Sequence, residues 1–404
     1  MRPLTSSVTL DPAAHVSARF LIALSLAVPA SVILGVTLLP LFWMWMIPAS
    51  IGGTELAPLF LVVGLVVVGL AWRPHVGQRR ARWWALGLGG WIVLLAGRTV
   101  VQVPTAWADA DRALQTGLAG TGLHPAAPAF HPFGDPLGLF IGLRTPDIAI
   151  DAAVALGDSE GVQLLGDVYH PPQPGPHPIV LVVHGGGWSS GSRSEGQTAS
   201  RALAAAGFLV VACDYRLAPA HRYPAQLADV HIALRWIRTH AAALGGDPTR
   251  IALLGRSAGA QLALLTAANP GSGIAAVIGL YSPVDFTAGW LDPGWPDPLH
   301  ARSVFIDYFG GPLAELPEQY REASPITHTE HPLPPTLLIY GQRDQLVYLR
   351  FGQSLADHLR AGGTPTVFIT IPWAEHAFDA IPHGLGGQLA LHAMERFLNG
   401  TLKR

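Results

Sequence analysis

The chain has 404 residues, of which 50% are hydrophobic and 13% are charged, a balance too apolar for an ordinary soluble enzyme. The formal net charge of −2 gives no electrostatic basis for nucleic-acid binding. The single cysteine, Cys213, excludes an internal disulfide. Histidines and cysteines do not occur at the spacing of metal ligands, so no metal site is predicted.

Three apolar segments near the N-terminus predict transmembrane helices, because a bilayer core needs about 20 apolar residues. They cover residues 20–40, 56–72 and 83–103. We therefore expect an integral membrane protein, with an N-terminal tail over residues 1–19 and an all-α membrane region over residues 20–104.

The short connections between these segments predict their orientation. The connection between the second and third segments contains four basic residues: Arg73, Arg79, Arg80 and Arg82. The first connection, Pro48 to Leu56, contains no basic residue and one acid, Glu55. The positive-inside rule places the arginine-containing connection in the cytoplasm. With three spans, the C-terminal domain is then expected outside the cytoplasm.

The remaining chain divides by composition. Residues 105–145 are rich in Ala, Gly, Pro and His, and they form either a linker or a lid segment over the active site. Residues 146–404 alternate apolar strands with amphipathic helices, a pattern typical of a mostly parallel sheet covered by helices on both faces. A Trp- and Pro-rich insertion interrupts this pattern over residues 282–332.

A G-x-S-x-G motif follows one of the buried strands. Gly255-Arg-Ser257-Ala-Gly259 joins the strand Ile251 to Leu254 to a helix of small and aliphatic residues. At such a tight strand-to-helix turn the serine has a strained backbone conformation and its hydroxyl is exposed at the edge of the sheet. The motif therefore predicts that Ser257 is a nucleophile.

A nucleophilic serine requires a base and an acid that orients the base. In this sheet topology they follow the serine in the order Asp or Glu, then His. Asp344 and His376 each come a few residues after a later strand, so we expect them to form the triad with Ser257. Asp285 is the alternative acid and His383 the alternative base.

The loop His184-Gly185-Gly186-Gly187 follows another buried strand. Glycines allow a loop to point its amides at the negative charge of a tetrahedral intermediate. We expect the amides of Gly186, Gly187 and Ala258 to form the oxyanion hole.

These motifs carry a resemblance to a known family. Residues Ile148 to Leu398 resemble the α/β-hydrolase superfamily. Four motifs are similar to those of hormone-sensitive-lipase-like carboxylesterases: His184-Gly-Gly-Gly-Trp188, Gly191-Ser192, Asp214-Tyr-Arg-Leu-Ala-Pro219 with Pro224-Ala225, and Gly255-x-Ser257-Ala-Gly259. The resemblance implies an α/β-hydrolase fold and hydrolysis of carboxylic esters without a cofactor. The chain departs from the family pattern at Arg256, where Asp is usual, and at Ala260, where Gly is frequent.

The expected function is that of a membrane-anchored serine carboxylesterase or lipase, acting on a small-molecule or lipid ester at the bilayer. Trp290, Trp295, Phe305 and Phe309 of the insertion are candidates for the acyl pocket, or alternatively for the core of a lid. An amidase similar to arylformamidases and an acyltransferase use the same triad and remain alternatives. A non-catalytic membrane receptor or scaffold on a hydrolase fold is the alternative of another class.

Overall fold

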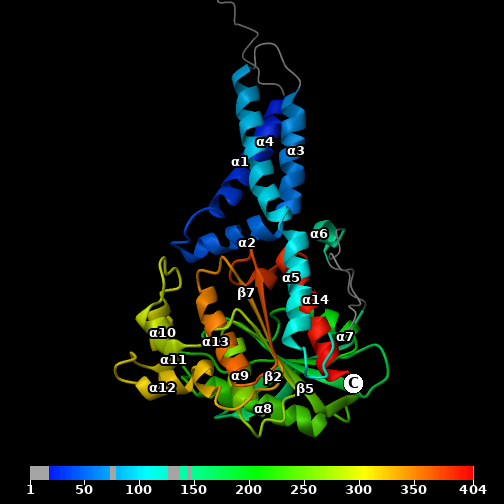
Figure 1. Ribbon diagram of the computed structural model, residues 1–404, viewed down its shortest axis with the longest axis vertical. Helices are drawn as coiled ribbons and strands as arrows, with labels where there is room; N and C mark the ends of the chain where they lie inside the picture. Colours follow the sequence, from blue (N-terminus) through cyan, green and yellow to red (C-terminus); the bar gives the residue numbers. More distant parts are fainter. Residues whose placement is uncertain (1–17, 73–78, 126–136, 143–146, 404) are drawn as a thin grey trace, which may run out of the picture.

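In the computed structural model, a stalk of helices stands on an α/β domain (Figure 1). The structure describes residues 18–72, 79–125, 137–142 and 147–403. The predicted N-terminal tail up to residue 17, Arg73 and parts of the segment 105–145 lie outside these residues.

The stalk and its base are formed by the first five helical elements. These are α1 (Ala18–Val36), the short 3-10 helix η2 (Met44–Met46), α2 (Ile47–Glu55), α3 (Ala57–Trp72) and α4 (Arg79–Val100). By length and composition, α1 and the helical stretch Arg79–Gly117 can each cross a membrane. The pair η2–α2 and α3, which meet at a bend of 75°, passes the same test together, so the described residues contain two candidate spans, or three if this pair is counted as one.

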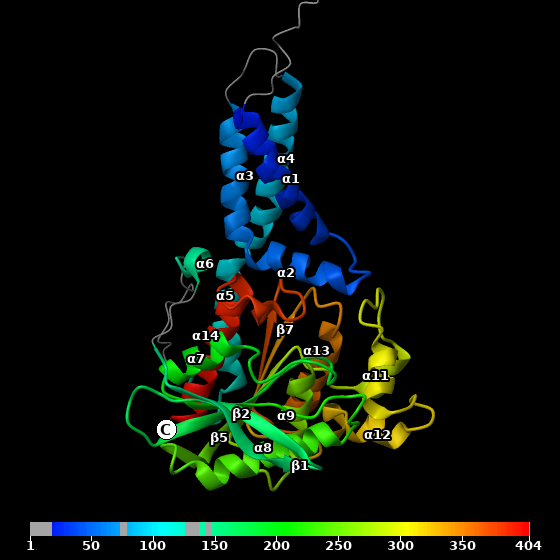
Figure 2. The same cartoon turned by 180° about the vertical axis from the view of Figure 1, so that it is seen from behind.

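The expected connection between the first two spans is itself a helix. α2 lies across the base of the stalk, between the stalk and the α/β domain (Figure 2). Met46, Ile47 and Ile51 are buried there in a small apolar cluster with Leu41. The apolar residues of this stretch are thus used for packing against the α/β domain, and the first helix ends at Val36 instead of near residue 40.

The domain is built on one eight-stranded sheet with the order β1-β2-β4-β3-β5-β6-β7-β8. The strands are β1 (Ile150–Ser159), β2 (Val162–Tyr169), β3 (His177–Val183), β4 (Leu209–Cys213), β5 (Gly246–Arg256), β6 (Ala276–Leu280), β7 (Thr336–Gly341) and β8 (Thr366–Ile371). β2 pairs antiparallel with β1 and β4, and all other pairs are parallel. This arrangement is an α/β-hydrolase fold.

Helices cover both faces of the sheet. The helices of the domain are α7 (Gln197–Ala205), α8 (Ala225–His240), α9 (Ala258–Ala268), α13 (Leu349–Ala361) and α14 (Leu385–Leu402). The insertion adds α10 (Phe286–Leu291), α11 (Ala301–Phe309), α12 (Pro317–Glu322) and the 3-10 helix η3 (Pro325–His328). A second 3-10 helix, η4 (Phe378–Ala380), precedes α14. α9 and α14 both pack on the central strands β5 and β6.

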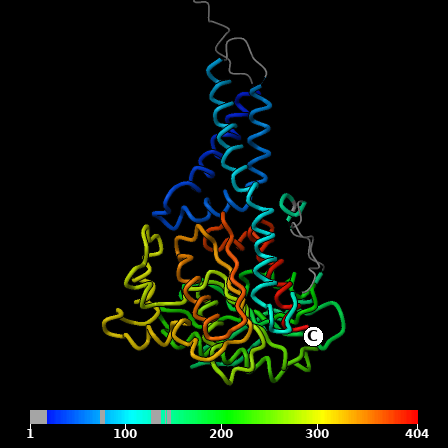
Figure 3. The backbone as a smooth tube through the Cα atoms, viewed as in Figure 1, coloured from blue at the N-terminus to red at the C-terminus, as the bar shows by residue number. Residues whose placement is uncertain are grey.

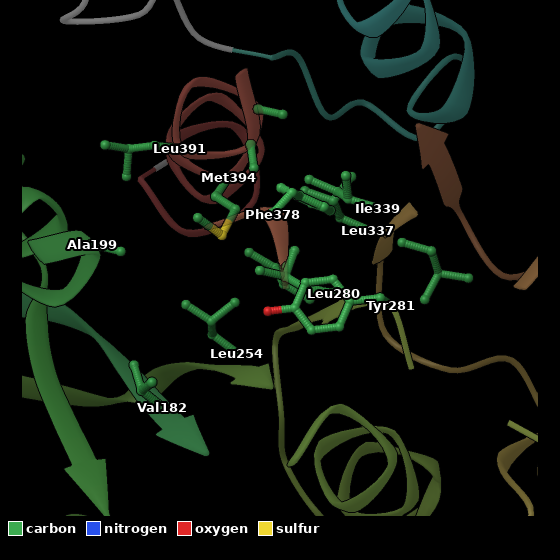
Figure 4. Packing of buried hydrophobic residues seen from close by; sticks show 14 of the residues in the cluster. Val182, Ala199, Leu254, Leu280, Tyr281, Leu337, Ile339, Phe378, Leu391 and Met394 are labelled. Carbon is green, nitrogen blue, oxygen red and sulfur yellow. The ribbon is translucent and has the colours of Figure 1, made fainter. Parts of the chain in front are cut away.

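The core lies between these helices and the central strands. β3, β4, β6 and β7 are buried along their whole length, because parallel strands between two helical layers contact apolar side chains on both faces. Met394 of α14 lies over the side chains of the central strands, including Leu254 and Leu280 (Figure 4). This rigid core positions the loops that follow the strands.

The first part of the predicted linker or lid segment is the helix α5 (Val103–Gly117), which packs against β8 and α14. Trp107 is buried with its ring 4.7 Å from that of His392, and Asp111 accepts a hydrogen bond of 3.0 Å from the same imidazole. A short helix, α6 (Gly138–Ile141), follows.

The carboxyl-terminal edge of the sheet faces the stalk. The blue segment before α3 lies directly above the orange and red segments that follow β7 and β8 (Figure 3). The Ser50 hydroxyl donates a hydrogen bond of 3.0 Å to Glu375, which lies in the loop after β8. The loops expected to carry the chemistry therefore lie between the sheet and the membrane helices.

Candidate active site

Ser257 occupies the turn between β5 and α9 in a strained backbone conformation, with φ 49° and ψ −120°. Such a conformation costs about 1–3 kcal/mol and persists only where the surrounding structure imposes it. The close approach of the turn to β3 imposes it here. A Cβ atom added at Gly259 would lie 2.2 Å from the His184 carbonyl oxygen. The glycine lets α9 start directly beside the glycine-rich loop.

Ser257, His376 and Asp344 lie in one hydrogen-bonded row. The Ser257 hydroxyl oxygen is 3.0 Å from His376 Nε2, and His376 Nδ1 is 2.8 Å from Asp344 Oδ2. The other oxygen of Asp344 accepts hydrogen bonds from the amides of Leu346 and Val347 at 2.9 and 2.8 Å. These amides fix the orientation of the carboxylate beside the imidazole. The structure thus brings together the three residues that the sequence predicts as a triad.

The alternative acid and base have other partners. Asp285 is the N-cap of α10, where its side chain accepts a hydrogen bond of 2.8 Å from the Ala288 amide. His383 lies just before α14, and its carbonyl accepts a hydrogen bond from the Gln388 side chain. The geometry therefore favours Asp344 and His376 over these two residues.

The predicted oxyanion donors lie in the glycine loop and directly after the serine. Gly186 and Gly187 line the same cavity as Ser257 and His376. Gly186 has a φ of 100°, and a Cβ atom there would lie 2.2 Å from the Ser190 carbonyl oxygen, so only glycine fits this turn. Ala258 is the first residue of α9, and the first four amides of a helix have no acceptor within it.

Aromatic side chains pack against the glycine loop and hold it in place. The His184 ring stacks on Tyr215 with a centroid separation of 4.0 Å. The Tyr215 hydroxyl donates to the Gly185 carbonyl at 2.9 Å, and the Trp188 indole donates to Gln261 at 3.0 Å. These contacts hold the loop at a fixed distance from α9, as a preorganised oxyanion site requires.

Two chambers meet at Ser257. The larger has a volume of about 440 Å³ and contains His376 and the glycine loop on its wall. The smaller has a volume of about 60 Å³ and is mainly apolar, with Trp188, Val304 and Phe305 on its wall. An ester bound at Ser257 therefore has separate space for the groups on its two sides.

Of the four candidates for the acyl pocket, Phe305 lines the smaller chamber. Trp290 and Phe309 instead pack against Tyr320, with ring centroids 5.7 and 4.1 Å away, in the core of the insertion. Trp295 is 75% exposed. Trp290 and Phe309 therefore fit the alternative of a lid core, and apolar content alone does not distinguish a pocket wall from the core of the insertion.

A buried polar network beside the serine was not expected from the sequence. Arg256 is 4% exposed, and its Nε donates to Asp379 Oδ2 at 2.5 Å. The Tyr281 hydroxyl donates to the other oxygen of Asp379, and burial raises the Tyr281 pKa well above its usual value, so it remains a neutral donor. The Tyr281 ring lies 4.5 Å from that of His376. The network ties the serine turn to the histidine loop. In the sequence, this network is indicated by Arg256 alone, which stands in the G-x-S-x-G motif where Asp is usual.

Replacing Asp379 by alanine is expected to destabilise the protein by about 3–5 kcal/mol, because it leaves the Arg256 guanidinium buried without its partner. The two side chains are only 5% and 9% exposed. Thermal unfolding of the detergent-solubilised protein, followed by tryptophan fluorescence, measures the loss. The double replacement Arg256→Met with Asp379→Leu should recover most of it. A single variant as stable as the wild type would contradict a structural role for this pair.

The base of the stalk also contacts the histidine loop. Glu375, next to His376, accepts hydrogen bonds from Ser50 at 3.0 Å and from Arg343 at 3.3 Å. Burial raises the pKa of Glu375 to about 7, against the opposing effect of the Arg343 guanidinium. Nothing in the sequence near Ser50 signals this contact, since a hydroxyl between two apolar segments has no characteristic spacing.

Residues 166–359 match the BD-FAE family. Esterase LipC of Mycobacterium tuberculosis is 34% identical over 244 residues, which are 55% of this chain and 58% of LipC. The probable carboxylic ester hydrolase LipM of the same organism is 30% identical over 303 residues, which are 70% of this chain and 68% of LipM.

The chain belongs to the carboxylic ester hydrolase family with an α/β-hydrolase fold. Solved structures support the fold of this hydrolase. The Pyrobaculum calidifontis esterase is 25% identical with a TM-score of 0.55, and covers 73% of this chain and 92% of its own. The carboxylesterase EstE1 from a metagenomic library is 23% identical with a TM-score of 0.57, and the match covers 75% of this chain and 98% of EstE1. The matched region of this hydrolase spans little more than half of LipC.

Proposed function

We propose that this hydrolase is a membrane-anchored serine carboxylesterase, with Ser257 as nucleophile, His376 as general base and acid, and Asp344 as the acid that orients the imidazole. The observation that carries the proposal is the row from Ser257 Oγ to His376, at 3.0 Å, and from His376 to Asp344, at 2.8 Å. Both distances are within the range in which a proton is transferred or shared.

The first half-reaction forms an acyl-enzyme. His376 Nε2 accepts the hydroxyl proton while Ser257 Oγ attacks the ester carbonyl carbon, and the negative charge moves to the carbonyl oxygen. The amides of Gly186, Gly187 and Ala258 stabilise that charge. Collapse of the tetrahedral intermediate breaks the bond to the alcohol oxygen, which leaves with the proton from His376.

The second half-reaction releases the acid. A water molecule gives its proton to His376 and attacks the acyl carbon, and the same amides stabilise the second tetrahedral intermediate. The bond to Ser257 Oγ then breaks, the proton returns to the serine, and the carboxylic acid leaves. Asp344 remains ionised throughout and stabilises the imidazolium.

The test of this proposal is turnover of p-nitrophenyl butyrate by the full-length protein in detergent, together with its loss in a Ser257 variant. The amount of carboxylic acid released, measured with and without an added acceptor alcohol, separates hydrolysis from acyl transfer. No turnover of any ester by the folded protein would reject the proposal and favour a scaffold function.

The membrane anchor in this proposal consists of α1, α3 and α4. Their outer surfaces expose large apolar side chains: Leu21, Ile22, Val32, Leu59, Val62, Leu65, Trp91 and Leu94. Contact between such a surface and water is unfavourable, whereas contact with the acyl chains of a bilayer is favourable. Arg79, Arg80 and Arg82 lie at the start of α4, at the end of the stalk away from the α/β domain. The positive-inside rule then places the α/β domain outside the cytoplasm.

A C-terminal fusion tests this orientation. We expect alkaline phosphatase, which is active only outside the cytoplasm, to be active when fused after Arg404, and green fluorescent protein at the same site to be dark. A fusion after Val76, in the arginine-containing connection, is the matched control and should give the opposite pattern. A fluorescent C-terminal fusion would contradict this orientation and place the α/β domain in the cytoplasm.

A further inference from the structure

The catalytic loops are bound to the segment that leaves the membrane. This docking segment comprises residues 37–55, between α1 and α3. The Leu41 amide donates a hydrogen bond of 2.9 Å to the Gln345 side chain, next to Asp344. The apolar cluster of the docking segment packs against three residues of the catalytic loops: Leu346, Ala377 and Ile381. Because α1 ends at Val36, these loops lie within a few residues of the membrane surface.

The docking segment forms part of the wall of the catalytic cavity. Met44 lines the larger chamber together with Ser257 and His376. Pro293 and Leu299 of the insertion line the smaller chamber, and Leu299 also lines the larger one. The insertion therefore borders both chambers, and the docking segment borders the larger one.

Four exposed aromatic residues form a continuous cluster at this position. We name it the aromatic rim: Phe42, Trp43, Trp45 and Trp295. The Phe42 ring lies 5.4 Å from Trp295 and 6.0 Å from Trp43, and Trp43 lies 6.0 Å from Trp45. Trp45 and Trp295 are 69% and 75% exposed. Met44 lies between two rim residues in the sequence, and Trp295 lies between Pro293 and Leu299, so the rim residues are close in the chain to residues that line the two chambers.

The occupant that fits the aromatic rim is the bilayer surface. Tryptophan is enriched where apolar acyl chains meet hydrated headgroups. The rim follows the end of α1 through Leu38 and Leu39, which are also exposed, so it continues the apolar surface of the stalk. The other end of the stalk has its own exposed tryptophans, including Trp72 and Trp84. Two tryptophan levels separated by the stalk helices are the arrangement expected of a membrane-spanning segment and its two interfaces.

We propose that the substrate is an ester of a membrane lipid, which moves from the outer surface of the bilayer into the catalytic cavity past the aromatic rim while its hydrophobic part stays in the membrane. This inference rests on the proposed esterase function. The chamber of about 60 Å³ takes the smaller group of the ester, and the chamber of about 440 Å³ takes the group that leads to the rim. A lipid with one short and one long group at the scissile ester has the matching shape.

Two probes with the same scissile bond test the inference. 4-Methylumbelliferyl butyrate is water-soluble, whereas 4-heptadecylumbelliferyl butyrate is anchored in a bilayer by its alkyl chain. With the full-length protein in phosphatidylcholine nanodiscs, we expect the anchored probe to be hydrolysed about tenfold faster at equal total concentration, because confinement raises its effective concentration at the rim.

The decisive measurement is the ratio of the two rates in rim variants. The double replacement Trp43→Ser with Trp295→Ser is expected to lower the ratio of anchored-probe to soluble-probe hydrolysis by about tenfold, since it removes two large interfacial aromatic contacts. Trp72→Ser with Trp84→Ser is the matched control, with side chains 68% and 70% exposed at the far end of the stalk. We expect it to keep the wild-type ratio. The single Trp295→Ser variant leaves the docking segment intact and should lower the ratio in the same direction.

The outcomes separate this inference from the function on which it rests. Hydrolysis of the soluble probe but not of the anchored probe overturns the lipid substrate and leaves the esterase. A ratio that is the same in the rim variants, the control and the wild type also overturns it. If neither probe is hydrolysed by the wild type, the proposed esterase function fails.

Discussion

The Ser257→Ala variant is expected to hydrolyse p-nitrophenyl butyrate about a millionfold more slowly than the wild type, as kcat. Without the hydroxyl, His376 has no proton to accept from the enzyme and the acyl-enzyme cannot form. The remaining rate would come from the oxyanion amides and from substrate binding. Steady-state kinetics with purified protein measure kcat, and a fluorophosphonate probe, which should label the wild type and not the variant, reports the nucleophile directly.

The matched control for this prediction is Ser272→Ala, on the loop between α9 and β6. Its hydroxyl donates a weak hydrogen bond of 3.4 Å to the Ala267 carbonyl, away from the cavity. This variant should keep both turnover and labelling. Wild-type turnover by the Ser257→Ala variant would show that the row at 257, 376 and 344 is not the site of ester cleavage.

The Asp344→Asn variant is expected to lower kcat by about 10⁴-fold. An amide nitrogen in place of the oxygen that lies 2.8 Å from His376 Nδ1 reverses the hydrogen bond and favours the tautomer that cannot accept the Ser257 proton. The fold should be preserved, because the amide oxygen can still accept from Leu346 and Val347. Kinetics over a range of pH, with thermal unfolding as the check on folding, measure this effect.

Asp285→Asn is the control, since Asp285 is the alternative acid by sequence. Asparagine is as good an N-cap as aspartate, so α10 should remain capped through the bond to Ala288. The expected change in kcat is below about tenfold, since Asp285 is not part of the row to His376. A loss of 10⁴-fold at residue 285 with little effect at residue 344 would exchange the roles of the two acids.

The stalk and the catalytic loops are joined by buried contacts as well as by the chain. Glu55, at the end of α2, is fully buried and accepts hydrogen bonds from the amides of Gly386 and Gly387 at the start of α14. Burial raises the pKa of Glu55 to about 8, against the opposing effect of these two amides. Together with the Ser50–Glu375 contact, this bond fixes the angle between the stalk and the sheet. The orientation of the cavity toward the membrane is therefore built into the fold.

Much of the site could be predicted from the sequence because its signals are local. The turn at Ser257 requires a glycine two positions before and two positions after the serine, and the glycines of the loop after His184 are consecutive. The order of serine, acid and base follows from the topology of a parallel sheet, in which the ends of the strands meet at one edge. The apolar segments of the stalk could be predicted from the sequence for the same reason, because a bilayer requires a certain length and composition of each helix separately.

The sequence by itself determined the α/β alternation, the apolar stalk and the identity of Ser257, Asp344 and His376 as candidates. Only the tertiary structure decided that α2 packs on the catalytic loops, that Asp379 pairs with both Arg256 and Tyr281, and that Met44, beside the aromatic rim, lines the cavity. The reason is physical: these contacts join residues separated by about a hundred positions or more, and each depends on shape and burial. A local pattern records which face of a segment is apolar, but not the partner on which that face packs.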